Sequence, residues 1–163
     1  FGVTGGVMEA ALRTAYAVLN GKELDGVDIA PVRGEAQLRE ADIDLGEGNG
    51  SIKVAICHGL ETARKLVKQA VEGTSPYTFI EVMACPGGCV DGGGTVRVKG
   101  EYHPHAASRT QGLYKLDKSM PRRQSHNNPQ VKALYADFLG EPNSHKAHEL
   151  LHTTYTAKEK FSN

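Results

Sequence analysis

Residues 77–94 read YTFIEVMACPGGCVDGGG, and this stretch decides both the fold and the candidate site. Tyr77–Met83 is rich in β-branched and aromatic side chains, which predicts a strand beginning after Pro76. The strand runs into a bend in which five of the eight residues 87–94 are glycine. Because ligands in α/β sheets bind at the carboxyl ends of strands, we expect a functional site at this bend.

The bend carries two thiols, Cys85 and Cys89, four residues apart. Such a pair can reach one polynuclear metal centre, and cysteine thiolates are the usual ligands of iron–sulfur clusters. The glycines allow backbone N–H groups to approach cluster sulfurs without a Cβ clash. Spacing alone leaves a glycine-rich bend with incidental thiols open, because two ligands complete no site. Zinc would need two more ligands, for which Cys57 and a histidine are the candidates.

The segments before the bend alternate between helix and strand patterns. The order is a helix, three strands, a helix and the strand of the bend, which predicts an α/β lobe with an about four-stranded sheet flanked by helices. The first helix is expected from an N-cap at Thr4 to about Leu19, with Gly21 ending it. The other predicted elements are strands at 27–32, 41–45 and 52–56, a turn at Asn49-Gly50, and a helix over Leu60–Val71.

The remainder of the chain has a different character. An amphipathic helix is predicted over Val131–Leu139, and a second short helix begins near Ser144. Residues 1–96 carry a net charge of −5 and residues 97–163 a net charge of +5. Short helices need a surface to dock on, and the opposite charges favour a tail that wraps its own lobe over one that binds nucleic acid. We therefore predict two segments: a lobe over 1–96 and a mainly helical tail over 97–163.

Composition also bears on the compartment. No apolar run approaches the roughly 18 residues of a membrane span, and no signal sequence is visible, so we expect no membrane partner. An odd count of three cysteines does not favour a disulfide framework. A cytoplasmic location is predicted.

Three parts of the chain resemble iron-only (FeFe) hydrogenases. Glu81–Gly94 is similar to the family's third cysteine motif, Met-Ala-Cys-Pro-Gly-Gly-Cys followed by a glycine triplet, and Phe1–Ala10 resembles the segment before it. Arg109–Tyr155 resembles the family's small-subunit segment, through Gly112-Leu113-Tyr114, Ser125-His126, Leu134-Tyr135, Phe138-Leu139-Gly140 and Ala147–Thr153. One departure is Thr95-Val96, which stand where the family usually has Gln-Pro.

The resemblance implies an active centre called the H-cluster, a 4Fe–4S cluster linked to a diiron unit with CO, CN and dithiolate ligands. Cys85 matches the ligand of the 4Fe–4S cluster alone, and Cys89 matches the ligand that bridges to the diiron unit. Met83 and Phe1 match residues packed against the diiron unit, and Gly2 lies beside it. The implied reaction is the reversible reduction of protons to dihydrogen, with Cys89, Met83 and Phe1 as its catalytic residues. Residues 1–96 then correspond to one lobe of the large-subunit catalytic domain, with a fused small-subunit-like tail.

In the family, the other cluster cysteines and the proton-relay residues precede these motifs. The implied partners are therefore the N-terminal remainder of the same subunit and ferredoxin or NAD(P)-linked electron-transfer subunits. The stretch at 112–118 favours an NAD(P)-linked enzyme. The isolated chain is expected to lack hydrogenase activity and to hold no complete H-cluster.

Two other functions are open. Hydrogenase-like proteins of eukaryotes bind iron–sulfur clusters and act in cluster assembly without making hydrogen. His148–His152 is a literal HExxH, a pattern of zinc hydrolases, although no third ligand follows it. Among single residues, Glu81 is interpreted as a strand-face carboxylate rather than a proton-transfer group, and Cys57 as a buried apolar residue. His103-Pro104-His105 is interpreted as a solvated loop rather than a metal dyad.

Overall fold

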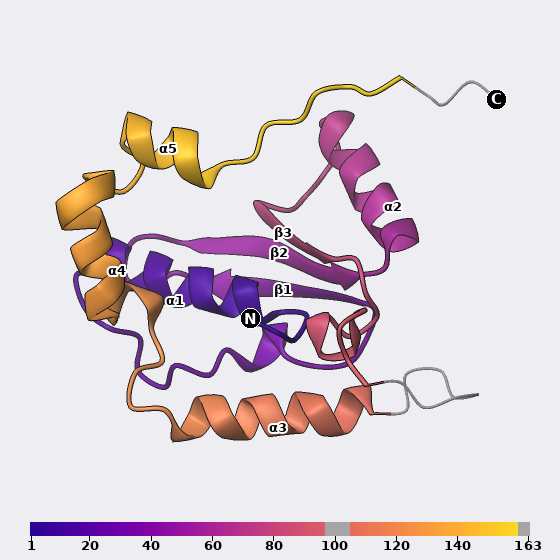
Figure 1. Cartoon of the computed structure of the whole chain (residues 1–163), viewed down its shortest axis with the longest axis horizontal. Helices are drawn as coiled ribbons and strands as arrows, with labels where there is room; N and C mark the ends of the chain where they lie inside the picture. Colours follow the sequence, from indigo (N-terminus) through magenta and orange to yellow (C-terminus); the bar gives the residue numbers. More distant parts are fainter. Residues whose placement is uncertain (97–104, 160–163) are drawn as a thin grey trace. The chain divides into compact units, whose positions relative to one another are not determined.

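The computed structural model describes residues 1–96 and 105–159, and the chain divides into two compact units, residues 1–124 and 125–163. The first unit is an α/β structure built around one sheet (Figure 1). Its elements are helix α1 (Gly6–Asn20), strands β1 (Leu38–Asp44) and β2 (Ser51–His58), helix α2 (Leu60–Val71), strand β3 (Phe79–Met83) and helix α3 (Ala106–Ser119).

The sheet has the order β1-β2-β3. β1 and β2 are antiparallel, with Ala41 opposite Val54, and the loop at Asn49-Gly50 joins them as predicted. β2 and β3 are parallel and are connected by α2, so the carboxyl end of β2 at His58 lies opposite Met83. The parallel pair therefore presents both of its carboxyl ends at the start of the glycine-rich bend.

Helices cover the two faces of the sheet. On one face, Met8 and Leu12 of α1 pack against Val54 and Ile56 of β2 and their neighbours. On the opposite face, Ala63 and Leu66 of α2 pack against Ala55 and Cys57. Alternate residues of β2 thus serve two separate apolar clusters, since successive side chains of a strand point to opposite faces. The predicted α/β class and the helices flanking the sheet are confirmed.

The strand predicted at 27–32 is wrong. The segment forms a short 3₁₀ turn, Ala30–Val32, in which the N–H of Val32 donates to the carbonyl of Ile29 at 3.1 Å. Pro31 has no N–H to offer a neighbouring strand, and Val32 is fully buried in the cluster beneath α1. The described sheet has three strands rather than four because burial of Val32, not strand pairing, orders this segment.

The N-cap predicted at Thr4 is also wrong. Gly5 precedes α1 with φ of 100°, in the left-handed region, and makes no side-chain cap. A Cβ on Gly5 would lie 2.2 Å from the carbonyl oxygen of Val32, so the close approach requires glycine. The end of α1 at Gly21 and the extent of α2 agree with the prediction.

Helix α3, which no pattern predicted, is held to the lobe by charge. Three arginines and three carboxylates from α1, the 27–33 segment and the α3 region gather in one network, and Arg33 also lies 4.6 Å from the centre of the Tyr114 ring. Arg33 Nε lies 3.0 Å from Glu9 Oε1, and Arg33 Nη2 lies 3.3 Å from Asp117 Oδ2. The members of this charge network are Glu9, Arg13, Asp28, Arg33, Asp117 and Arg123. Arg123, at the basic end of the α3 region, pairs with both Asp28 and Asp117.

The second unit is helical. It contains a 3₁₀ turn (Ser125–Asn127), α4 (Pro129–Leu134), a π-helical turn (Tyr135–Leu139) and α5 (His145–Leu151). The side chain of Ser144 caps α5 by accepting from the N–H of Ala147 at 3.1 Å, as its predicted start requires. Within residues 1–96 and 105–159, none of the helices has the length and apolar character needed to span a bilayer.

Candidate functional site

The two thiols lie on a tight bend that begins where β3 ends. The N–H of Gly88 donates to the carbonyl of Cys85 at 3.0 Å, and a 3₁₀ turn over Cys89–Asp91 follows. A Cβ on Gly92 would lie 3.8 Å from Cys85 Sγ and 3.6 Å from Cys89 Cα, so both cysteines lie against the same glycine. Cys85 is half-buried and Cys89 is exposed.

The N-terminal segment pairs with this bend. The N–H of Thr4 donates to the carbonyl of Gly87 at 3.0 Å, and the N–H of Val90 donates to the carbonyl of Gly2 at 2.9 Å. A Cβ on Gly88 would lie 2.7 Å from Thr4 N and 2.9 Å from the Gly2 carbonyl oxygen. The absence of a side chain at Gly88 thus lets the two segments approach, and this approach brings Phe1 and Gly2 beside the cysteine bend.

Glu81 anchors the same segment from the β3 side. Its carboxylate is buried and accepts from the N–H groups of Gly5 at 2.5 Å and Met8 at 2.6 Å. Arg39 Nη2 donates to the carbonyl of Thr4 at 2.7 Å. A carboxylate at a helix N-terminus satisfies free N–H groups and complements the helix dipole, so Glu81 is the true cap of α1. The interpretation of Glu81 as a strand-face carboxylate missed this structural role.

The far side of the bend is held from α3. Arg109 Nη1 lies 3.1 Å from both Asp91 Oδ1 and the Val90 carbonyl oxygen, and Nη2 lies 2.7 Å from the carbonyl oxygen of Val96. Asp91 is 1% exposed. The segment from Cys89 to Val96 is therefore fixed at both of its ends by one side chain.

These features agree with the donor set of an iron–sulfur cofactor that further ligands complete. The bend offers two thiols and glycines that admit a bulky group; Met83, which ends β3 before the bend, is half-buried, and Phe1 is exposed. Within the described ranges, no three His, Cys, Asp or Glu side chains gather as a metal site. The arrangement suits partial ligation of a polynuclear centre better than a closed tetrahedral zinc site.

The other predicted candidates lie elsewhere. The rings of His148 and His152 stack, with centroids 4.1 Å apart and planes 29° apart. Cys57 is fully buried in the cluster beneath α2, and burial raises the pKa of its thiol, so its interpretation as a buried apolar residue is confirmed. His105 is exposed at the start of α3, whereas His103 and Pro104 lie outside the described residues.

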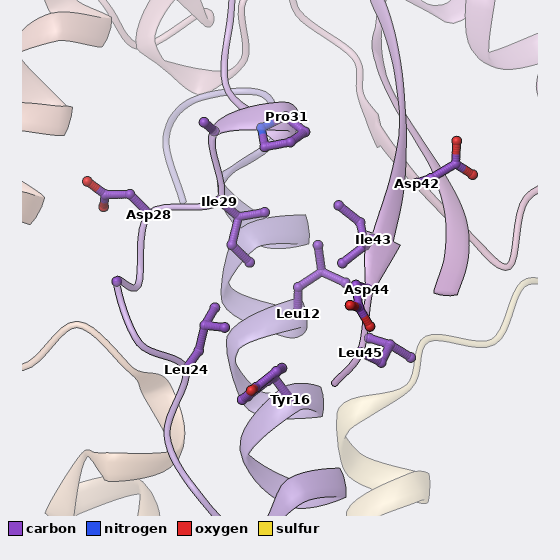
Figure 2. Close-up of a pocket in the computed structure, with 12 residues that line it drawn as sticks. Leu12, Tyr16, Leu24, Asp28, Ile29, Pro31, Asp42, Ile43, Asp44 and Leu45 are labelled. Atoms are coloured by element: carbon purple, nitrogen blue, oxygen red, sulfur yellow. The ribbon is translucent and has the colours of Figure 1, made fainter. Parts of the chain in front are cut away.

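The first unit also contains a pocket of about 350 Å³ that does not include the cysteine bend. Figure 2 shows Leu12, Ile29 and Ile43 pointing into it, with Tyr16 lower on α1. Its walls are α1, the 24–31 segment and the end of β1. This mostly apolar pocket lies beside α1, and its lining residues are far in sequence from the predicted cluster ligands Cys85 and Cys89.

Comparison with known proteins decides the family. Residues 1–93 match the family model of the iron only hydrogenase large subunit, C-terminal domain, and residues 104–158 match that of the iron hydrogenase small subunit. The chain belongs to the iron-only hydrogenase family. The boundary between the two matches lies between Asp91 and Arg109, so the ion pair of these residues joins the two family segments.

Individual members of the family resemble this chain along nearly its whole length. The NADP-reducing hydrogenase subunit HndD of Solidesulfovibrio fructosivorans is 44% identical over 99% of this chain and 27% of its own length. The cytosolic Fe-S cluster assembly factor narfl of Xenopus tropicalis is 32% identical over 99% of this chain and 33% of its own length. A solved structure of a variant of [FeFe]-hydrogenase HydA1 from Chlamydomonas reinhardtii, 39% identical, superposes with a TM-score of 0.68 over 96% of this chain and 46% of that one. The chain thus spans about a quarter to a third of the length of these two curated relatives.

Proposed function

We propose that this chain is the C-terminal part of the catalytic subunit of an iron-only hydrogenase, which reduces protons reversibly to dihydrogen at an H-cluster. The observation that carries the proposal is the cysteine bend: two thiols on a glycine-lined turn, paired with the Phe1–Gly2 segment, in a chain of this family. The 44% identity with a hydrogenase subunit over nearly the whole chain supports it.

Each residue of the bend has a proposed role. Cys85 would hold the 4Fe–4S cluster, and Cys89 would bridge that cluster to the diiron unit. Phe1 and Met83 would cover the diiron unit with apolar surface and exclude water, and Gly2 would leave room beside it. When bound, the H-cluster supplies the iron centre at which protons and electrons combine. The protein's own part is to place the two thiolates on the bend and to hold the Phe1–Gly2 segment against it.

Two thiols cannot complete the cofactor, so the remaining ligands and the proton path would come from an N-terminal remainder of the same subunit. Electrons would come from ferredoxin or an NAD(P)-linked subunit; the name of the NADP-reducing relative favours the second donor. A cytoplasmic location is proposed, on the name of the cytosolic assembly factor among the relatives.

The proposal is tested by infrared spectroscopy of the complete subunit after cofactor maturation. Bands of bound CO and CN, together with hydrogen evolution from a reduced mediator, are expected for the wild type. Cys89→Ser should abolish both, whereas the control Cys57→Ala, a change in the buried cluster beneath α2, should keep both. Hydrogen evolution by residues 1–163 alone would contradict the expected need for the upstream ligands.

The second candidate is an iron–sulfur protein of cluster assembly. It is favoured by the 32% identity with an assembly factor that matches 99% of the chain. Under this alternative the complete protein binds iron–sulfur clusters through Cys85 and Cys89 but lacks CO and CN bands. The same infrared measurement therefore separates the two functions.

A further inference from the structure

The glycine triplet Gly92–Gly94 follows Asp91 in the candidate site. Gly93 and Gly94 have no atom within 4 Å of a built Cβ, so packing does not hold them. Glycine also loses the most backbone freedom on ordering. Within the segment, the N–H and the hydroxyl of Thr95 donate to the carbonyl of Gly92 at 3.1 Å and 2.8 Å, and contacts from outside the segment add to this hold.

Arg109 supplies that hold at both ends of the segment. Its Nη1 contacts Asp91 Oδ1 and the Val90 carbonyl oxygen, both at 3.1 Å, before the glycines. Its Nη2 contacts the Val96 carbonyl oxygen at 2.7 Å, after them. A planar guanidinium presents several donors in a fixed fork, so one side chain can join these three acceptors, whereas an ammonium group at the end of a flexible stem cannot reproduce the geometry.

The contact is well shielded and connects the two family segments. Asp91 is 1% exposed and the Arg109 side chain is 26% exposed, so the ion pair is more than a solvated surface contact. Val90 also donates to the Gly2 carbonyl at 2.9 Å. Any shift of the Asp91 turn would therefore move both Cys89 and the Phe1–Gly2 segment.

We propose that Arg109, in the segment that matches the small subunit, is a positioning residue that locks the Cys89–Val96 segment in the shape required to present the Cys89 thiolate to the cofactor. The proposal rests on the proposed function for the identity of that cofactor. It gives the small-subunit segment a specific task in the site: to hold the last cysteine bend of the large-subunit segment.

Hydrogen exchange of the complete subunit, isolated without the diiron unit, tests the lock directly. In Arg109→Gln and Arg109→Lys, exchange of backbone amides in residues 85–96 should accelerate by about tenfold or more, because bonds to a charged partner are lost. Exchange in β2 should stay near the wild-type value, because the bend opens locally before the sheet does. The control Arg122→Gln removes an exposed arginine that follows α3. It should leave hydrogen exchange in residues 85–96 unchanged.

Asp91→Asn keeps the shape of the partner and provides an independent variant. It should accelerate the same amides, and the double variant with Arg109→Gln should add little, as expected for two members of one contact. Unchanged exchange in residues 85–96 for all three single variants would overturn the proposal. Acceleration spread evenly over the lobe would also overturn it, because it would indicate general destabilisation.

A second measurement concerns the matured subunit. The CO and CN bands of Arg109→Lys should be shifted or broadened relative to the wild type, while those of Arg122→Gln should match it. If the wild type itself shows no such bands, the hydrogenase proposal fails, but the exchange experiment still decides whether Arg109 locks the segment.

Discussion

At the scale of single residues, the candidate site depends on atoms that are close together in space but far apart in the chain. Gly88 admits the Thr4 backbone, and Glu81 accepts N–H groups 76 and 73 residues away. Neither contact leaves a local pattern in the sequence. The role of Cys85 and Cys89 as cluster ligands comes from motif and residue type and stays a prediction. The cap made by Glu81 could not be predicted, because its partners lie on another element.

The role of Gly88 predicts a sharp difference between two glycine substitutions. Gly88→Ala should destabilise the lobe by roughly 1–3 kcal/mol, because φ is +102° and the new Cβ would meet Thr4 N at 2.7 Å. Gly93→Ala, in open space without a positive φ, should have little effect. Urea unfolding of the complete subunit measures both, and equal losses would contradict the close approach described for Gly88.

The cap of α1 predicts the effect of removing one charge. Glu81→Gln should lower the free energy of unfolding by about 1–3 kcal/mol, because the carboxylate that accepts from Gly5 and Met8 is replaced in a buried position. Glu61→Gln is the matched control: its side chain is 85% exposed and pairs with Lys65 at 3.3 Å, so about 0.5 kcal/mol or less is expected. Comparable losses in the two variants would argue against the capping role.

At the scale of elements, strong periodicity was predictive and weak periodicity was not. The alternation in β1 and β2 and the extent of α2 were predicted from sequence, and for the strands burial on one face dictates the pattern. The apolar residues at 27–32 match a strand pattern, but in the structure they lead into the 3₁₀ turn Ala30–Val32, in which Val32 is buried. Helix α3 was missed because charged side chains, rather than an apolar stripe, attach it to the lobe.

This charged attachment predicts sensitivity to acid. The hydrogen bond from Arg123, together with the charges of Arg33, Arg123 and Arg13, holds the pKa of Asp28 below its ordinary value of 3.8. Burial alone would raise the pKa of Asp117, but the bond from Arg123 and the neighbouring arginines lower it overall.

Both carboxylates therefore stabilise the folded state fully above pH 3.8, and this contribution is lost as the pH falls through their lower folded pKa values. Arg123→Gln should reduce the loss of stability between about pH 5 and pH 2 relative to the wild type, as measured by the urea midpoint at each pH. Arg122→Gln should follow the wild-type curve. Identical pH curves for Arg123→Gln and the wild type would contradict a role of the network in attaching α3.

At the scale of the whole molecule, two boundaries differ. The sequence predicts a boundary at residue 96 between lobe and tail, whereas the compact units of the structure divide at residue 124. The family matches end at 93 and begin again at 104, whereas α3 belongs to the first compact unit by its contacts. The opposite net charges of residues 1–96 and 97–163 predicted that the basic tail packs against the acidic lobe. Within residues 106–124, Arg109 and Arg123 make such contacts, with Asp91 and Asp28 of the lobe. For residues 125–159 the wrapping of the lobe stays a prediction.

The difference between the two boundaries can be measured by truncation. A subunit truncated after Gln124, with its N-terminal part intact, should retain slow hydrogen exchange in residues 85–96, because Arg109 and Arg123 are both kept. One ending at Val96 should exchange faster there, by about tenfold or more, since three bonds from Arg109 are lost. Equal exchange in the two truncated proteins would indicate that α3 does not stabilise the bend.

The bond between Glu81 and Gly5 also bears on the order of events during synthesis. Gly5 is translated before Glu81, so the carboxylate that accepts its N–H is made 76 residues later. Until then the Phe1–Gly5 segment lacks the carboxylate with which it pairs, and contacts between residues so far apart in sequence are intrinsically slow to form. The pairing of the Phe1–Gly5 segment with Glu81 and the cysteine bend is therefore a late event, complete only after residue 90 has been translated.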